Sequence, residues 1–129
     1  MAKDHWRQKQ SLDKYFIESK AKGFRSRSAF KLQEIDQKLK LFTSNISILD
    51  LGSRPGGWSQ YIAKQNHKKL NIIANDINVM NKINGVSFLQ GDFTEKRIQE
   101  SLINMNNNNK FNIILSDISP NKTGNKITD

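Results

Sequence analysis

Acidic residues follow the predicted strands of this chain, where they could bind the hydroxyl and amino groups of a nucleotide-like ligand. Asp76, Asp92 and Asp117 each close or follow a short apolar run. An acid at the end of a second strand can accept hydrogen bonds from both hydroxyls of a ribose, and one after a third strand can meet an adenine amino group. Each of them alone is equally explained as a helix cap or a turn residue. Their recurrence at successive strand ends predicts a ligand site.

A glycine-rich turn stands before these acids in the sequence. The apolar run 46–51 contains Asp50 and is followed by Gly52-Ser53-Arg54-Pro55-Gly56-Gly57, after which Trp58 begins a segment with helical spacing. This is the strand, tight loop and helix start with which open α/β sheets hold a nucleotide-like ligand. A dinucleotide-binding domain of the NAD type is an alternative. It fits less well, because the turn lacks the Gly-x-Gly-x-x-Gly spacing.

The remaining pattern predicts the elements that position these residues. Hydrophobic periodicity indicates a basic amphipathic helix over 5–22, a break at Gly23, and a second helix that begins near Ser26 or Ser28 and carries apolar residues as far as Phe42. Strands then alternate with helices, which implies parallel pairing and a three-layer α/β fold. The expected strands are 46–51, 70–76, 86–90 and 111–117, the expected helices are 57–65 and 95–103, and 104–110 is expected to be a polar loop.

Composition limits the classes of protein to which the chain can belong. It has 129 residues, no cysteine, 36% hydrophobic residues and a formal net charge of +9, which fits one domain without disulfides. Neither a signal peptide nor a membrane-spanning run is visible, so we expect a cytoplasmic protein that does not contact a membrane. His, Asp and Glu do not show metal-ligand spacing, and nothing indicates oligomerisation. We therefore expect no bound metal ion and a monomer.

The positive charge is concentrated near the N-terminus. Residues 1–40 hold 11 Lys or Arg against five Asp or Glu, whereas residues 41–129 hold ten against seven. Lys20, Lys22, Arg25 and Arg27 occur together without an acid between them, a pattern that attracts a phosphate backbone. A solvated helix face is the simpler alternative. We expect two parts: a basic, RNA-facing helical part over 1–42 and an α/β part over 43–129.

The chain resembles the FtsJ family, also called RrmJ, from about residue 10 to its last residue. The segments that carry the resemblance are Gly23-Phe24-Arg25-Ser26-Arg27-Ser28-Ala29-Phe30-Lys31-Leu32, Asp50-Leu51-Gly52 with Pro55-Gly56-Gly57-Trp58-Ser59-Gln60-Tyr61, Phe88-Leu89-Gln90-Gly91-Asp92-Phe93, and Ser116-Asp117 with Ser119-Pro120-Asn121. Members of that family are S-adenosylmethionine-dependent methyltransferases that modify a ribose 2′-hydroxyl of 23S ribosomal RNA.

The resemblance implies a Rossmann-like methyltransferase fold, S-adenosyl-L-methionine as cofactor, and 23S rRNA or the large ribosomal subunit as partner, with a uridine ribose as the expected target. It further implies that Gly56 and Trp58 line the methionine end of the cofactor, that Asp76 holds its ribose, and that Asp92 meets its adenine. Asp117 is expected at both the cofactor and the catalytic site. Lys31 and Asp117 correspond to two members of the family's Lys-Asp-Lys-Glu catalytic set.

Two departures from the family pattern affect these expectations. Ser53-Arg54 stands where the family usually has two small residues, so Arg54 either crowds the cofactor or points outward. The family's second lysine, its proposed catalytic base, and its later glutamate are not among the 129 residues. We therefore expect a chain lacking the C-terminal strands, with 111–117 as an exposed apolar edge. The alternative function is a catalytically impaired remnant that binds RNA or the ribosome.

Overall fold

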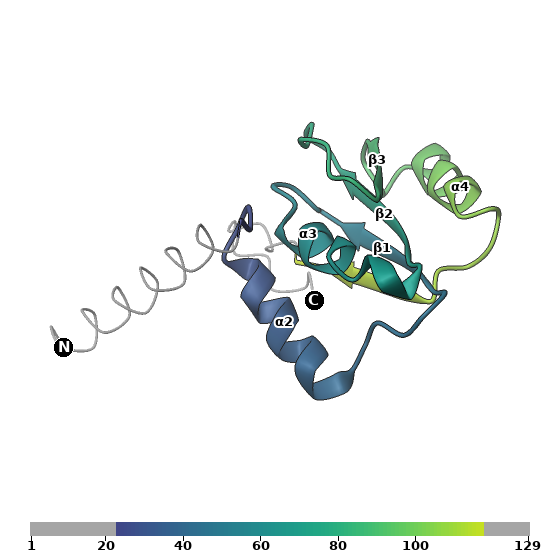
Figure 1. Ribbon diagram of the computed structural model, residues 1–129. Helices are drawn as coiled ribbons and strands as arrows, with labels where there is room; N and C mark the ends of the chain where they lie inside the picture. The colour runs from purple at the N-terminus through teal and green to yellow at the C-terminus, as the bar shows by residue number, and fades with distance from the viewer. Residues whose placement is uncertain (1–22, 118–129) are drawn as a thin grey trace, which may run out of the picture.

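Four parallel strands form the centre of the computed structural model, which describes residues 23–117. The strands are β1 (Ser47–Leu51), β2 (Asn71–Asp76), β3 (Val86–Gln90) and β4 (Ile113–Ser116), in the spatial order β3-β2-β1-β4 (Figure 1). Each pairs in parallel with its neighbour. All four predicted strands are confirmed, with ends within two residues of those expected. The helix expected over 5–22 lies outside the described residues.

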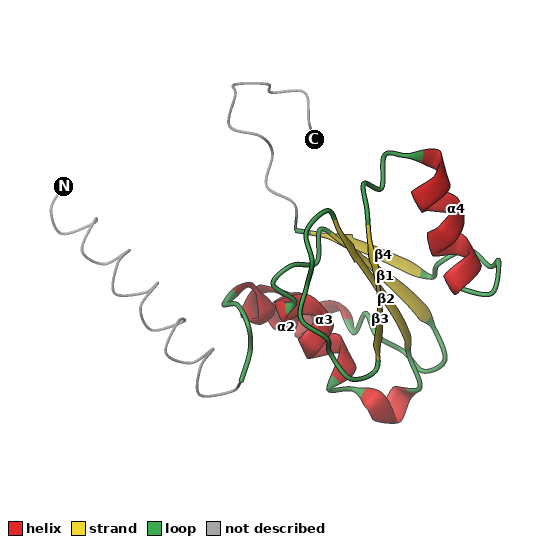
Figure 2. Ribbon diagram, turned by 90° about the horizontal axis from the view of Figure 1, so that it is seen from above, coloured by secondary structure: helices red, strands yellow, loops and turns green. Residues whose placement is uncertain are grey.

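Helices cover both faces of the sheet. Helices α2 (Ser28–Leu39) and α3 (Gly57–Ala63) and the short 3₁₀ helix η1 (Asn66–Lys68) lie on one side, and α4 (Lys96–Met105) lies on the other (Figure 2). The predicted three-layer α/β architecture is therefore confirmed. Within the described part of the chain, no helix combines the length and the apolar composition needed to cross a membrane.

The core on the α2/α3 side follows from the alternation of side chains along the strands. Ile48 of β1 and Ile72 of β2 pack there with Leu32 of α2 and with Trp58 and Ile62 of α3. Because Leu32 shares this core with the sheet, α2 packs as part of the α/β unit. The predicted division of the chain at residue 42 stays a prediction, but α2 does not form a separate core.

Helix α2 starts without the predicted side-chain cap. Its N-cap residue is Arg27, and Ser28 is already the first helical residue. The Ser26 and Ser28 hydroxyls instead bond to each other at 2.6 Å. At the other end Lys40 adopts a left-handed conformation and closes the helix, so Phe42 lies beyond it. This closure ends the helix before the apolar spacing does.

The α4 side of the sheet is only partly covered. Leu49 and Ile73 pack against Ile98 and Leu102 of α4, next to the central strands. Strand β4 is the edge strand, and Ile114, which its position in the parallel register places on the same face as Leu49, is 60% exposed. The expected exposed apolar edge is therefore present in the described part of the chain.

The asparagine-rich connection between α4 and β4 has a structural role that the sequence did not reveal. Asn107 and Asn108 adopt positive φ angles of 55° and 59°, a conformation that asparagine tolerates better than most residues. Asn106 is buried, and its amide group donates to the carbonyl oxygens of Asn109 and Lys110 at 2.9 and 3.2 Å. This run therefore forms the turn that leads into the edge strand.

Candidate functional site

The glycine-rich loop after β1 lies at the carboxyl edge of the sheet. Gly52 and Gly56 have φ angles of +68° and +115°, which side chains with a Cβ rarely adopt. A Cβ on Gly56 would lie 2.9 Å from the Ile83 side chain. The Ser53 N–H donates to the Asn75 carbonyl oxygen of β2 at 3.0 Å. Glycine is therefore required where the loop turns and where its backbone meets neighbouring side chains.

Asp76 ends β2 beside this loop, as predicted. Its carboxylate accepts the backbone N–H of Arg54 at 3.0 Å and that of Asn78 at 2.8 Å. It lines a cavity of about 290 Å³ together with Gly52, Arg54, Asn75, Ile77, Asn78, Phe93 and Asp117. The two N–H groups fix the carboxylate, and its remaining lone pairs can accept hydrogen bonds from ligand hydroxyls.

Asp92 follows β3 as predicted, but it does not line this cavity; its neighbour Phe93 does. One carboxylate oxygen of Asp92 accepts the N–H and the hydroxyl of Thr94 at 2.9 and 2.7 Å. These hydrogen bonds lower the pKa of Asp92. The carboxylate is thus held ionised and fixed at the sheet edge, while the apolar Phe93 ring supplies a wall of the cavity.

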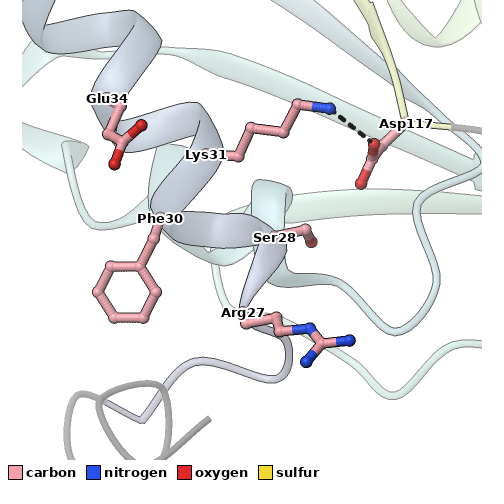
Figure 3. Close-up of a pocket in the computed structure, with 6 residues that line it drawn as sticks. All are labelled: Arg27, Ser28, Phe30, Lys31, Glu34 and Asp117. Atoms are coloured by element: carbon pink, nitrogen blue, oxygen red, sulfur yellow. Dashed lines mark ion pairs between the residues drawn. The ribbon is translucent and has the colours of Figure 1, made fainter. Parts of the chain in front are cut away.

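Lys31 and Asp117 meet across a second cavity. The Lys31 ammonium, on α2, lies 3.7 Å from the Asp117 carboxylate at the end of β4. Figure 3 shows the Lys31 side chain extended toward Asp117, while Phe30 and Glu34 point elsewhere. The cavity measures about 390 Å³ and is lined by Arg27, Ser28, Phe30, Lys31, Glu34 and Asp117. The structure therefore brings together the two residues for which a catalytic role is expected.

Asp117 also links these cavities to a third, smaller hollow behind the glycine loop. This hollow measures about 90 Å³, and its lining includes Asp50, Gly52, Trp58 and Asp117. Trp58 is nearly buried, and its indole N–H donates to the Ser28 carbonyl oxygen at 2.8 Å. Asp117 thus stands where the loop-side cavities meet the Lys31 cavity.

Asp50 is a buried carboxyl group beneath the loop. It is 1% exposed, and the Ser59 hydroxyl donates to it at 2.7 Å. Burial raises the pKa of Asp50 from 3.8 to about 6, the Ser59 hydrogen bond opposes this, and the nearby carboxylates Asp117 and Asp76 add to it. Its hydrogen bond ties the first turn of α3 to β1, on either side of the glycine loop.

Apart from Arg25, the remaining predicted site residues are Gly56, Arg27, Lys20 and Lys22, and of the two that the structure describes only Arg27 lines one of the cavities described above. Gly56 is buried between the side chains of Ile83 and Arg25 and lines none of the three cavities described above. Its contact with the cofactor stays a prediction. Arg27 is exposed and lines the Lys31 cavity. Lys20 and Lys22 lie outside the described residues.

Arg25 has contacts that sequence reasoning did not anticipate. Its guanidinium donates to the carbonyl oxygens of Pro55, Asn81 and Lys82, in two different loops. Its backbone N–H donates to the Gln60 side-chain oxygen of α3 at 2.6 Å. The RNA-binding role expected of Arg25 stays a prediction, and these contacts give the residue a second, internal role.

Sequence reasoning also missed Asn75, which shapes the carboxyl edge of the sheet. Asn75 is buried in β2, and its amide donates to the carbonyl oxygens of Leu89 and Gly91 at 2.9 and 3.1 Å. It thereby fixes the end of β3 next to the end of β2. The signal available in the sequence was a polar residue inside an otherwise apolar strand, which calls for hydrogen-bond partners when buried.

The described residues contain no group of three or more His, Cys, Asp or Glu side chains that could hold a metal ion. Asp76 and Asp117 act electrostatically on Asp50, but the three do not form such a group. The expectation that the protein works without a metal stays a prediction.

Comparison with known proteins places this arrangement in a family. The chain is 47% identical over 121 residues to the ribosomal RNA large subunit methyltransferase E of Buchnera aphidicola subsp. Schizaphis graminum, matching 94% of this chain and 59% of that protein. The crystal structure of a ribosomal RNA methyltransferase from Plasmodium falciparum superposes with a TM-score of 0.71 and 38% identity, over 81% of this chain and 61% of that one. The chain therefore spans about three fifths of the length of these relatives. Residues 24–129 match the model of the FtsJ-like methyltransferases, and the chain belongs to that family.

Proposed function

We propose that this chain provides the cofactor-binding part of an S-adenosylmethionine-dependent methyltransferase that modifies a ribose 2′-hydroxyl, with a uridine of 23S rRNA in the large ribosomal subunit as the target. The observation that carries the proposal is the position of Asp117. It lines both the cavity that contains Asp76 and the cavity that contains Lys31. A cofactor on one side of Asp117 and a substrate hydroxyl on the other would meet at this residue.

The residues present fit S-adenosylmethionine. The cavity at the end of β2 offers the carboxylate of Asp76 for ribose hydroxyls and the ring of Phe93 for a base, and Gly52 gives backbone access. Asp92 stands at the adjacent strand end, ionised. When bound, the cofactor supplies an electrophilic methyl group on a sulfonium. Gly56 and Trp58 would line the methionine end, as the resemblance implies.

Lys31 and Asp117 would position the substrate. A ribose hydroxyl placed beside this pair can donate to the Asp117 carboxylate while Lys31, 3.7 Å away, holds the carboxylate in place. Such alignment of a nucleophile with an electrophile supplies much of the rate in a displacement of this kind. The hydroxyl proton must also be accepted. The resemblance assigns that task to the family's second lysine, which the 129 residues do not include.

The basic N-terminal segment would bind the RNA. Arg27 is exposed beside the Lys31 cavity, and Lys20 and Lys22 precede it in the sequence. Together with the net charge of +9, this arrangement would draw the phosphate backbone toward the catalytic pair. We infer a monomeric protein that acts on ribosomal particles in the cytoplasm.

The test is transfer of labelled methyl from S-adenosylmethionine to large subunits that lack the modification. A protein that continues past residue 129 to include the family's second lysine should label a ribose 2′-oxygen, detected as a linkage resistant to alkali. Lys31→Ala should lower the rate by at least about a hundredfold. Lys38→Ala, two turns along the same helix and exposed, is the matched control and should stay within twofold.

Three outcomes contradict the proposal. Failure of a folded, extended protein to transfer methyl would refute it. Labelling of a base in place of a ribose would refute the assigned chemistry. Binding of RNA with a steep salt dependence but without S-adenosylmethionine binding would favour the non-catalytic RNA- or ribosome-binding alternative.

A further inference from the structure

Arg25 joins two loops that are far apart in the sequence. Its Nη1 donates to the carbonyl oxygens of Pro55 at 3.2 Å and Asn81 at 2.6 Å, and its Nη2 donates to that of Lys82 at 2.7 Å. The first acceptor belongs to the glycine loop after β1. The other two belong to the connection between β2 and β3. One planar guanidinium therefore holds backbone from both loops.

The two loops also touch directly, next to Arg25. A Cβ on Gly56 would lie 2.9 Å from Ile83 Cδ1 and 3.2 Å from Arg25 Nη1. The Ser53 hydroxyl lies 3.4 Å from the Met80 sulfur, a weak interaction. Most of the polar bonding between the glycine loop and residues 80–83 is thus supplied by the Arg25 side chain.

These loops form opposite walls of the proposed cofactor cavity. Gly52 and Arg54 line it from the glycine loop, and Ile77 and Asn78 line it from the start of the β2–β3 connection. Asp76 stands between them and accepts backbone N–H groups from both sides. A change in the distance between the loops would therefore alter the cavity and the hydrogen bonds that fix Asp76.

The position of Arg25 is itself fixed by α3. Its backbone N–H donates to Gln60 Oε1 at 2.6 Å, and Gln60 Nε2 donates to the Gly23 carbonyl oxygen at 3.2 Å. Lys64, one turn further along, places its ammonium 4.3 Å from the centre of the Phe24 ring. The short segment before α2 is thus held against α3, which presents the guanidinium to the loops.

We propose that Arg25 is a positioning residue that sets the shape of the cofactor site by clamping the glycine loop to the β2–β3 connection. The proposal rests on the proposed function, since it takes that cavity as the cofactor site. Arginine suits this task because its planar fork donates in several fixed directions, whereas the lysine ammonium is a compact point charge. Arg27, two residues away, is exposed and has no such bonds among the described residues.

The experiment compares Arg25→Ala, Arg25→Lys and Arg27→Ala in the full chain. Amide hydrogen exchange of residues 52–57 and 77–85, measured without any ligand, reports on the clamp itself. Both segments should exchange at least about tenfold faster in Arg25→Ala, because about three hydrogen bonds are lost. Arg25→Lys should recover only part of the protection, and Arg27→Ala should match the wild type. If Arg25→Ala fails to fold, Arg25→Lys provides the same comparison.

Calorimetric titration and RNA binding then separate the clamp from a phosphate contact. Arg25→Ala should weaken S-adenosylmethionine binding at least about tenfold and lower RNA affinity less than Arg27→Ala does. Arg27→Ala should show the reverse pattern. Unchanged exchange in both segments would overturn the clamp, as would a loss of RNA affinity in Arg25→Ala equal to that in Arg27→Ala without a loss of S-adenosylmethionine affinity. If Arg25→Ala exchanges faster than the wild type but the wild type binds no S-adenosylmethionine, the proposed function is refuted and the clamp stays supported.

Discussion

The buried carboxyl group of Asp50 should make the fold less stable as the pH rises through the weakly acidic range. Its pKa is 3.8 in the unfolded chain and about 6 in the folded protein, chiefly because the group is buried. Below pH 3.8 the group is protonated in both states and contributes nothing. Between pH 3.8 and 6 only the folded state keeps the proton, so stability falls with pH, and above pH 6 the loss is complete.

The size of the effect follows from the pKa difference. Each pH unit corresponds to about 1.4 kcal/mol, so the rise from 3.8 to about 6 amounts to ~3 kcal/mol above pH 6. Asp50→Asn removes the ionisation and keeps an oxygen that can accept the Ser59 hydroxyl. Its free energy of unfolding should therefore rise relative to the wild type by ~2 kcal/mol between pH 4 and pH 7.5, because a small part of the loss has already occurred at pH 4.

Urea unfolding followed by circular dichroism at a series of pH values measures this difference. The control is Glu100→Gln, which removes an exposed carboxylate from α4; its difference from the wild type should stay flat. A flat curve for Asp50→Asn would refute the reasoning, because it would mean that Asp50 ionises as easily in the folded chain as in the unfolded one. The same comparison can be made in a Ser59→Ala background, with and without Asp50→Asn. There the stability difference should extend to higher pH, because the Ser59 hydrogen bond favours the ionised form of Asp50.

Three further predictions follow from the contacts. Trp58→Phe should cost about 1–2 kcal/mol in urea unfolding, because the indole N–H that bonds the Ser28 carbonyl oxygen at 2.8 Å is lost; an unchanged midpoint would contradict this. Asp76→Asn should weaken S-adenosylmethionine binding at least about tenfold by calorimetry, because an amide has one acceptor oxygen where the carboxylate uses two; an affinity within twofold of the wild type would argue against the ribose role. Ile114→Lys should reduce aggregation at high protein concentration, measured by light scattering, while changing stability by less than about 0.5 kcal/mol, because Ile114 is 60% exposed on an edge strand; equal scattering would show that this edge does not drive aggregation.

Much of the fold could be predicted from the sequence because its signals are local. The apolar run ending at Asp50, the alternation of strands with helices, and the glycine-rich turn each reflect preferences over a few residues. A parallel sheet then brings all carboxyl ends to one edge, so Asp76 and Asp92 are predicted at the same sheet edge as the glycine loop. The start of α2 was predicted less well, because Ser26 and Ser28 bond to each other and leave the helix end uncapped.

The roles of the site residues stay predictions, and the structure adds the contacts between them. Asp117 and Lys31 were named from the family resemblance, and their 3.7 Å pairing brings them together. Asp92 was expected to face the same ligand as Asp76, yet Phe93 is the residue that lines the cavity. The backbone conformation after β3 decides whether Asp92 or Phe93 faces the cavity, and hydrophobic periodicity does not determine that conformation.

Local patterns in the chain already predict the order of the elements, the parallel sheet, the glycine loop and the acids at the sheet edge. These depend on short-range patterning and on the geometry common to all parallel sheets. The folded structure adds that Arg25 bonds to Pro55, Asn81 and Lys82, and that burial raises the pKa of Asp50 to about 6. Both features arise from packing, because hydrogen-bond partners distant in sequence and the exclusion of water are not encoded in any local stretch of residues.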